Sequence, residues 1–198
     1  MAMANDTETT RQMALTVLEK NGFKWERVGK GQRYVVRLEK NGEESFALLK
    51  VASLGSAMVR TSDDDTDSAT ISGFGPDIDY VLFAVGDATS QTARTIRAFL
   101  VPANEAEGAF REAHRDFRAN SPNSRPSSTW VISFFGKGYP AGNDFARKWA
   151  NYEIGSAMSV GSPTVEQTSQ KLTVAEAKRL LAESFGVSPE NIKIVIEA

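Results

Sequence analysis

The sequence predicts a mixed α/β or α+β fold in which helices flank a central mixed sheet. Three observations predict it. Helical and strand-like hydrophobic patterns alternate along the 198 residues, no internal repeat appears, and 41% hydrophobic with 24% charged residues is the composition of a globular protein. A chain of this length forms one ordinary domain or a domain with a small appendage, and it is long enough to bury a sizeable core.

The first half of the chain is predicted to form one helix and then strands. Apolar residues at helical spacing, Leu15 and Leu18 among them, end at Asn21-Gly22, which is a helix stop signal. Runs rich in β-formers follow, and Lys40-Asn41-Gly42 is a turn of the hairpin type. The expected elements are a helix over 10–20, strands over 23–28, 32–38 and 45–51, and a loop over 53–75.

The second half is predicted to begin with two more strands. Pro102 closes the second of these strands and starts a helix, because proline suits the first helical turn. The expected elements are strands over 80–85 and 95–101, a helix from 102 to about 119, a loop over 120–129, a strand over 130–135, and a helix over 143–154. The aromatic residues concentrated over 130–152 fit a core or a subunit interface better than a surface that stacks bases.

We expect four segments along the chain. Residues 1–9 are predicted to be a flexible N-terminus, 10–154 a core domain, and 155–170 a linker rich in Ser, Gly and Thr. Residues 171–198 are predicted to form a helix–strand appendage that starts with a capping box. Below about 40 residues such a unit cannot hold itself together, so we expect it to dock on the core domain or to mediate dimerisation.

Composition removes several classes of chemistry. The chain has no cysteine and one histidine, which excludes disulfide scaffolds, thiolate zinc sites and cysteine nucleophiles. His114 is the only candidate imidazole base, and packing beside an apolar helix face is the favoured interpretation. We expect a cytoplasmic protein, because the first residues lack the features of a signal peptide and no apolar stretch approaches the roughly 20 residues that span a bilayer.

The formal charge of −2 conceals an uneven distribution. Residues 1–62 carry a net +3, 63–110 a net −7, 111–150 a net +4, and 151–198 a net −2. Nucleic-acid binding depends on local clustering of charge, so the low overall charge does not exclude a basic face.

The order of the expected elements and several local phrases carry a family resemblance. The phrases are Leu18–Phe23 at the end of the first helix, Arg33–Leu38 and Ala47–Ser53 as core strands, and Pro76–Val85 with Ala98–Pro102 as later strands. Over roughly residues 10–118 the chain resembles the PD-(D/E)XK, or restriction-endonuclease-like, superfamily. The resemblance implies a nuclease-like core in which two carboxylates hold Mg²⁺ and a lysine stabilises the attacking hydroxide.

The chain departs from that pattern at the metal site. Lys50 matches the lysine, but Leu48 stands at the acid position two residues before it. The acid of the preceding strand falls near Val35 or Val36, and both are apolar. The resemblance therefore implies a degenerate member with Lys50 as a remnant. We expect no cofactor and no metal, and Mg²⁺ only if acids from elsewhere replace the missing pair.

Two charged clusters are further candidate sites. Asp63, Asp64, Asp65 and Asp67 lack the spacing of a calcium loop, so a solvated loop is favoured over a cation site. Asp77 and Asp79 are expected to cap the approach to a strand. The helix over 102–119 carries arginines at helical spacing on one face. Together with a loop arginine and the remnant lysine, they form the candidate binding set: Lys50, Arg111, Arg115, Arg118 and Arg125.

The arginine stripe has a second interpretation as a solvated face with i,i+4 pairs such as Glu107 with Arg111. Our leading functional hypothesis is a non-catalytic nuclease-like domain that binds nucleic acid or an acidic, nucleic-acid-processing protein partner. The resemblance suggests a bacterial or phage defence context. One alternative is a homo-oligomeric module that self-associates through 171–198. The other is an active Mg²⁺-dependent endonuclease with displaced acidic ligands.

Overall fold

The computed structural model describes residues 4–28, 33–52, 55–86, 94–136 and 143–159. The chain divides into two units, Met1–Val160 and Gly161–Ala198. The second unit lies outside the described residues, as do the predicted appendage over 171–198 and residues 160–170 of the predicted linker. The predictions for those segments therefore stay predictions.

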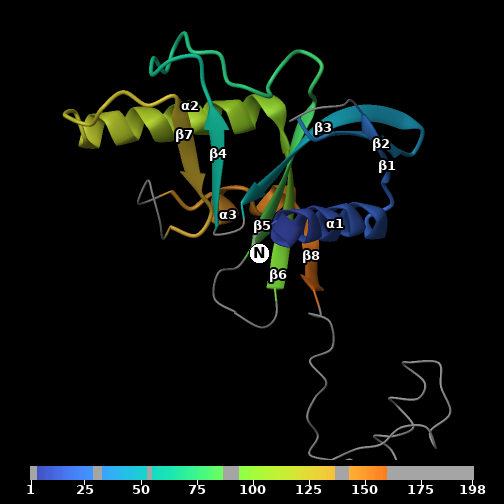
Figure 1. Ribbon diagram of the computed structural model, residues 1–198. Coiled ribbons are helices and arrows are strands. Elements are labelled where there is room, and N and C mark those ends of the chain that lie inside the picture. The colour runs from blue at the N-terminus through green and yellow to red at the C-terminus, as the bar shows by residue number, and fades with distance from the viewer. Residues whose placement is uncertain (1–3, 29–32, 53–54, 87–93, 137–142, 160–198) are drawn as a thin grey trace, which may run out of the picture. The chain divides into compact units, whose positions relative to one another are not determined.

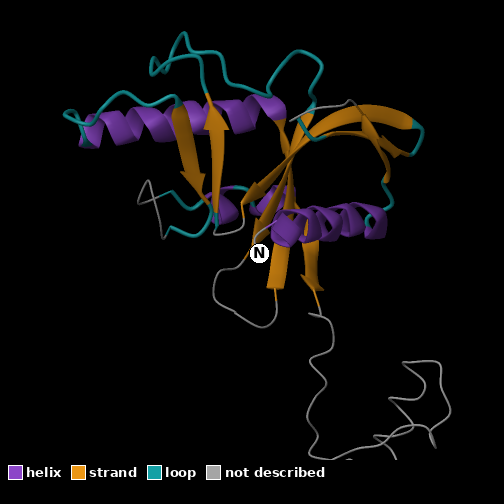
Figure 2. Ribbon diagram, viewed as in Figure 1, coloured by secondary structure: helices purple, strands orange, loops and turns teal. Residues whose placement is uncertain are grey.

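Six strands form a mixed sheet, which confirms the predicted fold class (Figures 1 and 2). The sheet has the strand order β1-β2-β3-β5-β6-β8. Its strands are β1 (Lys24–Val28), β2 (Val35–Lys40), β3 (Glu43–Ala52), β5 (Tyr80–Gly86), β6 (Arg94–Pro102) and β8 (Glu153–Ser159). Strands β3 and β5 are parallel, and every other neighbouring pair is antiparallel. Parallel pairing requires a crossover connection, and the chain between β3 and β5 supplies it.

The predicted turn at Lys40-Asn41-Gly42 is confirmed. Lys40 pairs with Glu43, so Asn41 and Gly42 form a two-residue hairpin loop. Both turn residues have positive φ, 56° and 84°, which is the conformation that Asn-Gly adopts most readily. This turn sets the register of β2 against β3 and places Val35 opposite Leu48.

Helices and a small second sheet cover the two faces of the main sheet. Helix α1 (Ala4–Lys20) packs its buried leucines against one face. Helix α2 (Ala103–Asn120) and the two-stranded sheet of β4 (Ser56–Arg60) and β7 (Thr129–Ser133) enclose a second core on the other face. The short helix α3 (Phe145–Lys148) and a 3₁₀ turn over Ala150–Tyr152 add Trp149, which stacks on Phe83 with ring centroids 5.4 Å apart. The aromatic cluster is thus mainly core, as favoured from its sequence.

The structure corrects four boundaries. The predicted flexible N-terminus over 1–9 is wrong from Ala4 onward, because α1 begins there. The predicted loop over 53–75 contains β4, whose partner β7 lies about 70 residues away and is invisible to local pattern. The predicted helix over 143–154 is broken into α3, the 3₁₀ turn and the start of β8.

The fourth correction concerns residues 155–159, which were predicted to begin a linker and instead belong to β8. Their small size has a packing reason. A Cβ on Gly155, whose φ is +135°, would lie 3.5 Å from Val17 Cγ1 of α1, and the Asn21 side-chain amide donates to the Ile154 carbonyl at 2.7 Å. Small residues here let the helix approach the edge strand. None of the helices among the described residues is long and apolar enough to cross a bilayer.

Replacing Gly55 by alanine is expected to destabilise the protein, whereas Gly108→Ala is expected to stabilise it. Gly55 has φ +73°, and an added Cβ would lie 2.7 Å from Phe135 Cδ2. The backbone conformation alone costs a non-glycine residue about 1–2 kcal/mol. Gly108 lies in α2 with nothing within 4 Å of an added Cβ, so alanine gains about 1 kcal/mol of helix propensity. Urea unfolding of both variants measures the difference, and a Gly55 variant as stable as the wild type would contradict this account of the turn into β4.

Candidate anion-binding site

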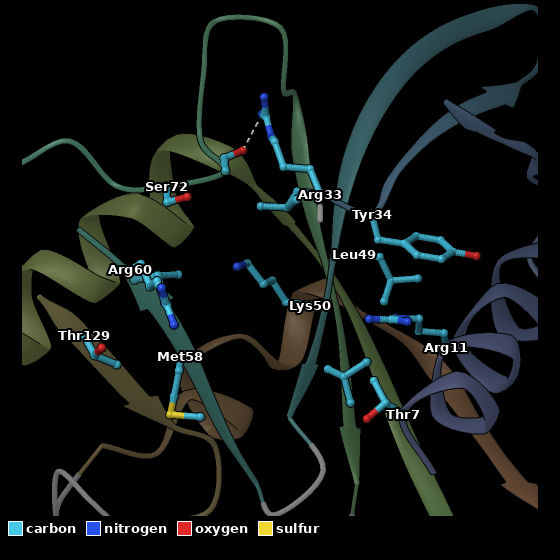
Figure 3. Close-up of a pocket in the computed structure, with 14 residues that line it drawn as sticks. Thr7, Arg11, Arg33, Tyr34, Leu49, Lys50, Met58, Arg60, Ser72 and Thr129 are labelled. Atoms are coloured by element: carbon cyan, nitrogen blue, oxygen red, sulfur yellow. Dashed lines mark hydrogen bonds between the residues drawn. The ribbon is translucent and has the colours of Figure 1, made fainter. Parts of the chain in front are cut away.

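Lys50 lies in a pocket of about 570 Å³ between β3 of the main sheet and β4 (Figure 3). Its side chain points into the space between Arg60 and Arg33. The residues lining the pocket come from the first half of α1, residues 33–34 just before β2, strands β3 and β4, the chain over 72–73, and β7. They are Thr7, Arg11, Arg33, Tyr34, Leu48, Leu49, Lys50, Val51, Met58, Val59, Arg60, Ser72, Gly73 and Thr129.

Strand alternation places the two cations that project from β3 and β4. In β3, Leu48, Lys50 and Ala52 share the face that carries the second core, because side chains of a strand alternate between faces. Leu48 and Ala52 are buried, and Lys50 between them is partly buried. In β4, Val59 faces the second core. The next residue, Arg60, points to the opposite side of the strand, where it is exposed and lines the pocket.

Two further arginines are held in fixed positions at the pocket. Arg33 Nη2 donates to the Gly73 carbonyl at 2.6 Å, which ties the guanidinium to the chain beside β4. Arg11 of α1 pairs with Glu8 at 3.1 Å, and its guanidinium carbon lies 5.0 Å from the centre of the Tyr34 ring. Part of the Arg11 charge is therefore offset within the chain.

The lining of the pocket is basic. It includes four basic side chains and, within the described part of the chain, no carboxylate. Burial, and to a smaller extent the charge of Arg33, lower the pKa of the Lys50 ammonium below its ordinary value. Among the described residues no ion pair neutralises Lys50, Arg33 or Arg60. Lys50 is partly buried, whereas Arg33 and Arg60 are exposed. A bound anion would offset the unfavourable burial of the Lys50 ammonium and the repulsion among the three cations.

The positions at which the family resemblance expects acids lie beside this pocket and are apolar. Val35 and Leu48 are direct cross-strand partners, Val36 is fully buried, and Leu48 is 2% exposed and lines the pocket. Across the described ranges, no group of three or more His, Asp or Glu side chains is arranged to hold a metal ion. The apolar side chains of Val35, Val36 and Leu48 therefore do not supply the metal ligands that the active-nuclease alternative requires.

The arginine stripe of α2 makes contacts within the chain. Arg111 donates to the Thr66 carbonyl at 2.7 Å and also pairs with Glu107 at 2.7 Å, the i,i+4 pair expected from the sequence. The two other arginines bind the acidic segment as well. The contacts are Arg115 Nη2 to Asp67 Oδ1 at 3.0 Å and Arg118 Nε to Asp64 Oδ2 at 3.4 Å. The stripe therefore holds the loop over 63–69 against α2 and does not present a row of unoccupied guanidinium groups to a phosphate backbone.

Asp64 is the centre of that contact. Its Oδ1 lies 2.7 Å from His114 Nε2 and accepts the backbone N–H of Ser127 at 2.9 Å. Burial of the carboxylate works to raise its pKa, but the hydrogen bonds from Ser127 and His114 and the charge of Arg118 prevail, so the pKa of Asp64 is lowered. His114 is 3% exposed and stacks on Trp130 with ring centroids 4.7 Å apart. The histidine is a packed core residue, as its sequence position favoured.

The other aspartates of this region have local roles. Asp63 and Asp65 accept backbone N–H groups two residues ahead, at 2.9 Å each, and so form the turns that shape the loop. Asp79 accepts the backbone N–H of Phe46 at 2.8 Å, which confirms that it caps the approach to β5. Serine and aspartate in this stretch therefore shape the backbone of the loop through local hydrogen bonds.

Three pocket residues were missed by sequence reasoning: Arg11, Arg33 and Arg60. They come from three elements separated along the chain and follow no motif spacing. The only signal was the net +3 of residues 1–62, which contains all of them together with Lys50. Arg125, by contrast, is exposed in the loop before β7 and does not line the pocket.

No protein-family model, no curated protein and no solved structure matches this chain significantly. The PD-(D/E)XK resemblance therefore remains a hypothesis drawn from the local phrases and the element order. The function has to be inferred from the chemistry of the site.

Proposed function

We propose that the protein is a non-catalytic, nuclease-like domain that binds nucleic acid through the pocket around Lys50. The observation that carries the proposal is the lining of that pocket, which includes Lys50, Arg11, Arg33 and Arg60 and no described carboxylate. Phosphate groups are the anions that lysine and arginine recognise most often in this way, through charge-assisted hydrogen bonds.

The remainder of the lining suits a nucleotide. Ser72 and Thr129 bring hydroxyl groups to the pocket, and hydroxyls are common phosphate and sugar contacts in protein–nucleic acid complexes. Leu48 and Met58 add an apolar wall, and the Met58 residue is 63% exposed. A volume of about 570 Å³ falls in the range typical of small-molecule and cofactor sites.

Binding without turnover is favoured because the positions of the metal-holding acids are Val35, Val36 and Leu48. A hydroxide cannot be held over a phosphate by a metal that has no ligands. The family resemblance rests on the order helix, strand, turn, strand with a terminal lysine, loop, two strands and helix. The structure contains these elements, with β1 and β4 as additional strands. This order supports a nuclease-like domain that has kept its lysine.

The proposal changes the set of expected contact residues. Lys50 stays at its centre, and Arg33 and Arg60 join it. Arg111, Arg115 and Arg118 leave it, because the acidic loop occupies them. Arg125 stays a peripheral candidate on the exposed loop before β7.

Binding to labelled oligonucleotides is expected to weaken steeply as salt increases. Each phosphate contacted contributes about −0.9 to the slope of log K against log salt for duplex DNA and about −0.7 for single strands. Arg60→Gln is expected to weaken binding by about tenfold, the effect of losing one charge-assisted contact. The slope of log K against log salt should become shallower by about the contribution of one phosphate contact. Fluorescence anisotropy at several salt concentrations measures both quantities.

Arg37→Gln is the matched control, because the Arg37 side chain on β2 is 42% exposed and pairs with Glu26 and Glu44 away from the pocket lining. Its binding should equal that of the wild type. If Arg115→Gln weakens binding as much as Arg60→Gln, the α2 stripe is the binding surface and the proposal is wrong. Absence of binding to any oligonucleotide at low salt is the other result that overturns it.

A further inference from the structure

We infer that the Lys50 pocket takes a terminal phosphate, the phosphomonoester of a strand end or of a nucleotide, and not an internal phosphodiester of a strand. This inference rests on the proposed function and names the part of the nucleic acid that enters the pocket. Three observations carry it: the charge of the pocket, the elements that border it, and the side chains at its wall.

The charge of the pocket exceeds that of one internal phosphate. Arg11 is partly neutralised by Glu8, which leaves Lys50, Arg33 and Arg60 without a carboxylate partner among the described residues. An internal phosphodiester carries one negative charge, whereas a phosphomonoester carries about −1.5 to −2 at pH 7 and has three free oxygens. Three cations around one recess match the doubly charged group.

Separate elements border the pocket on several sides, and the pocket is open to solvent on the remaining side. Lys50 projects from β3, the first half of α1 contributes Thr7 and Arg11, and β4 contributes Met58 and Arg60 (Figure 3). The chain over 72–73 closes another side, where Arg33 is tied to the Gly73 carbonyl. An internal phosphate needs room for a nucleoside on both of its ester oxygens. A terminal phosphate enters with one nucleoside behind it, which suits a recess of this volume.

The wall beside the cations fits that single nucleoside. Met58 is one of two large hydrophobic side chains that are prominently exposed among the described residues, and it lines this pocket together with buried Leu48. A thioether packs well against an aromatic ring such as a base, without selecting one base by hydrogen bonds. We therefore expect recognition of the terminal phosphate with little dependence on the identity of the base.

The test compares labelled oligonucleotides of one sequence that carry a 5′-phosphate, a 3′-phosphate or hydroxyl groups at both ends. We expect one phosphorylated form to bind about tenfold more tightly than the hydroxyl form, the effect of an additional charge-assisted contact. Lys50→Met should abolish this difference, and Lys20→Met, at the exposed end of α1, should preserve it. Competition with a nucleoside monophosphate then distinguishes the two sources: equal competition indicates a free nucleotide as ligand, and weak competition indicates a strand end.

Two results overturn the inference and separate it from the proposed function. If all three oligonucleotides bind equally and Lys50→Met weakens all of them, the pocket binds internal phosphates, and only the inference fails. If neither the oligonucleotides nor the monophosphate bind to the wild-type protein at low salt, the inference and the proposed function fail together.

Discussion

Lys50→Met is expected to reduce oligonucleotide binding by about 10- to 100-fold while leaving the protein at least as stable as the wild type. The loss of binding follows from removal of the central cation, since a hydrogen bond to a charged group contributes about 1.5–3 kcal/mol. The stability follows from the lowered pKa of Lys50, which shows that burial and Arg33 disfavour the ammonium in the folded state. Methionine keeps the length of the side chain and removes the charge that is disfavoured.

The pH dependence has a definite sign. A lysine whose pKa is lower in the folded than in the unfolded state destabilises the fold at pH values below the folded pKa, and this penalty disappears as pH rises toward the unfolded value near 10.4. At neutral pH the wild type therefore carries the penalty and Lys50→Met does not. Urea unfolding at pH 7 measures the difference, with Lys20→Met as the control on an exposed lysine.

Ligand-dependent stability gives an independent check. A ligand that binds only the folded state raises the midpoint of unfolding by mass action. Oligonucleotide at a concentration that saturates the wild type should therefore stabilise the wild type and Lys20→Met by more than it stabilises Lys50→Met. Undiminished binding by the folded Lys50→Met variant would show that Lys50 is not part of the binding site.

Asp64→Asn is expected to lower the free energy of unfolding by about 1.5–3 kcal/mol, the contribution of hydrogen bonds to a charged group. The carboxylate is 19% exposed and joins three partners, which are Arg118, the His114 ring and the backbone N–H of Ser127. The amide keeps the shape but loses the negative charge beside Arg118. The connection between α2, the acidic loop and the start of β7 is weakened as a result.

The control for this prediction is Asp67→Asn. Asp67 is 82% exposed and pairs with the exposed Arg115, so Asp67→Asn should lower the free energy of unfolding by less than about 1 kcal/mol. Acid titration supplies a second readout. Because the pKa of Asp64 is lowered in the folded state, its stabilisation is complete above the unfolded value near 3.9 and is lost as pH falls through the folded pKa. The difference in free energy of unfolding between the wild type and Asp64→Asn should therefore narrow below about pH 4. If Asp64→Asn and Asp67→Asn lower the free energy of unfolding equally at pH 7, the central role of Asp64 is contradicted.

The acidic loop shows that charges evident along the sequence can pair with each other within the fold. The net −7 of residues 63–110 and the net +4 of residues 111–150 were evident from composition. Taken separately, they suggest a cation site and a phosphate site. In the folded chain the loop and α2 lie together, and Asp64 and Arg118 satisfy each other. Charge along a sequence shows which groups require partners but not which groups supply them.

The sequence alone determined the elements whose signals are local. The Asn41-Gly42 turn, the apolar run of β5 and the amphipathic pattern of α2 depend on neighbours a few residues away, and each was predicted close to its observed position. The position of Lys50 in a predicted strand, two residues after the apolar Leu48, was also readable from the sequence. The absence of cysteine and the single histidine likewise follow from composition.

Only the tertiary structure decided where the basic residues meet. Arg33 and Arg60 are 27 positions apart in the chain. Arg60 reaches the pocket because β4 follows the turn at Gly55, and Arg33 is held there by its hydrogen bond to the Gly73 carbonyl. Strand β8 acquired its structure by pairing with β6, about 60 residues earlier, although its composition is typical of a linker. Contacts of this kind depend on which distant segments pack together, and a local pattern carries no information about that choice. The pocket around Lys50 is therefore a property of the fold, assembled from residues that are individually unremarkable in the sequence.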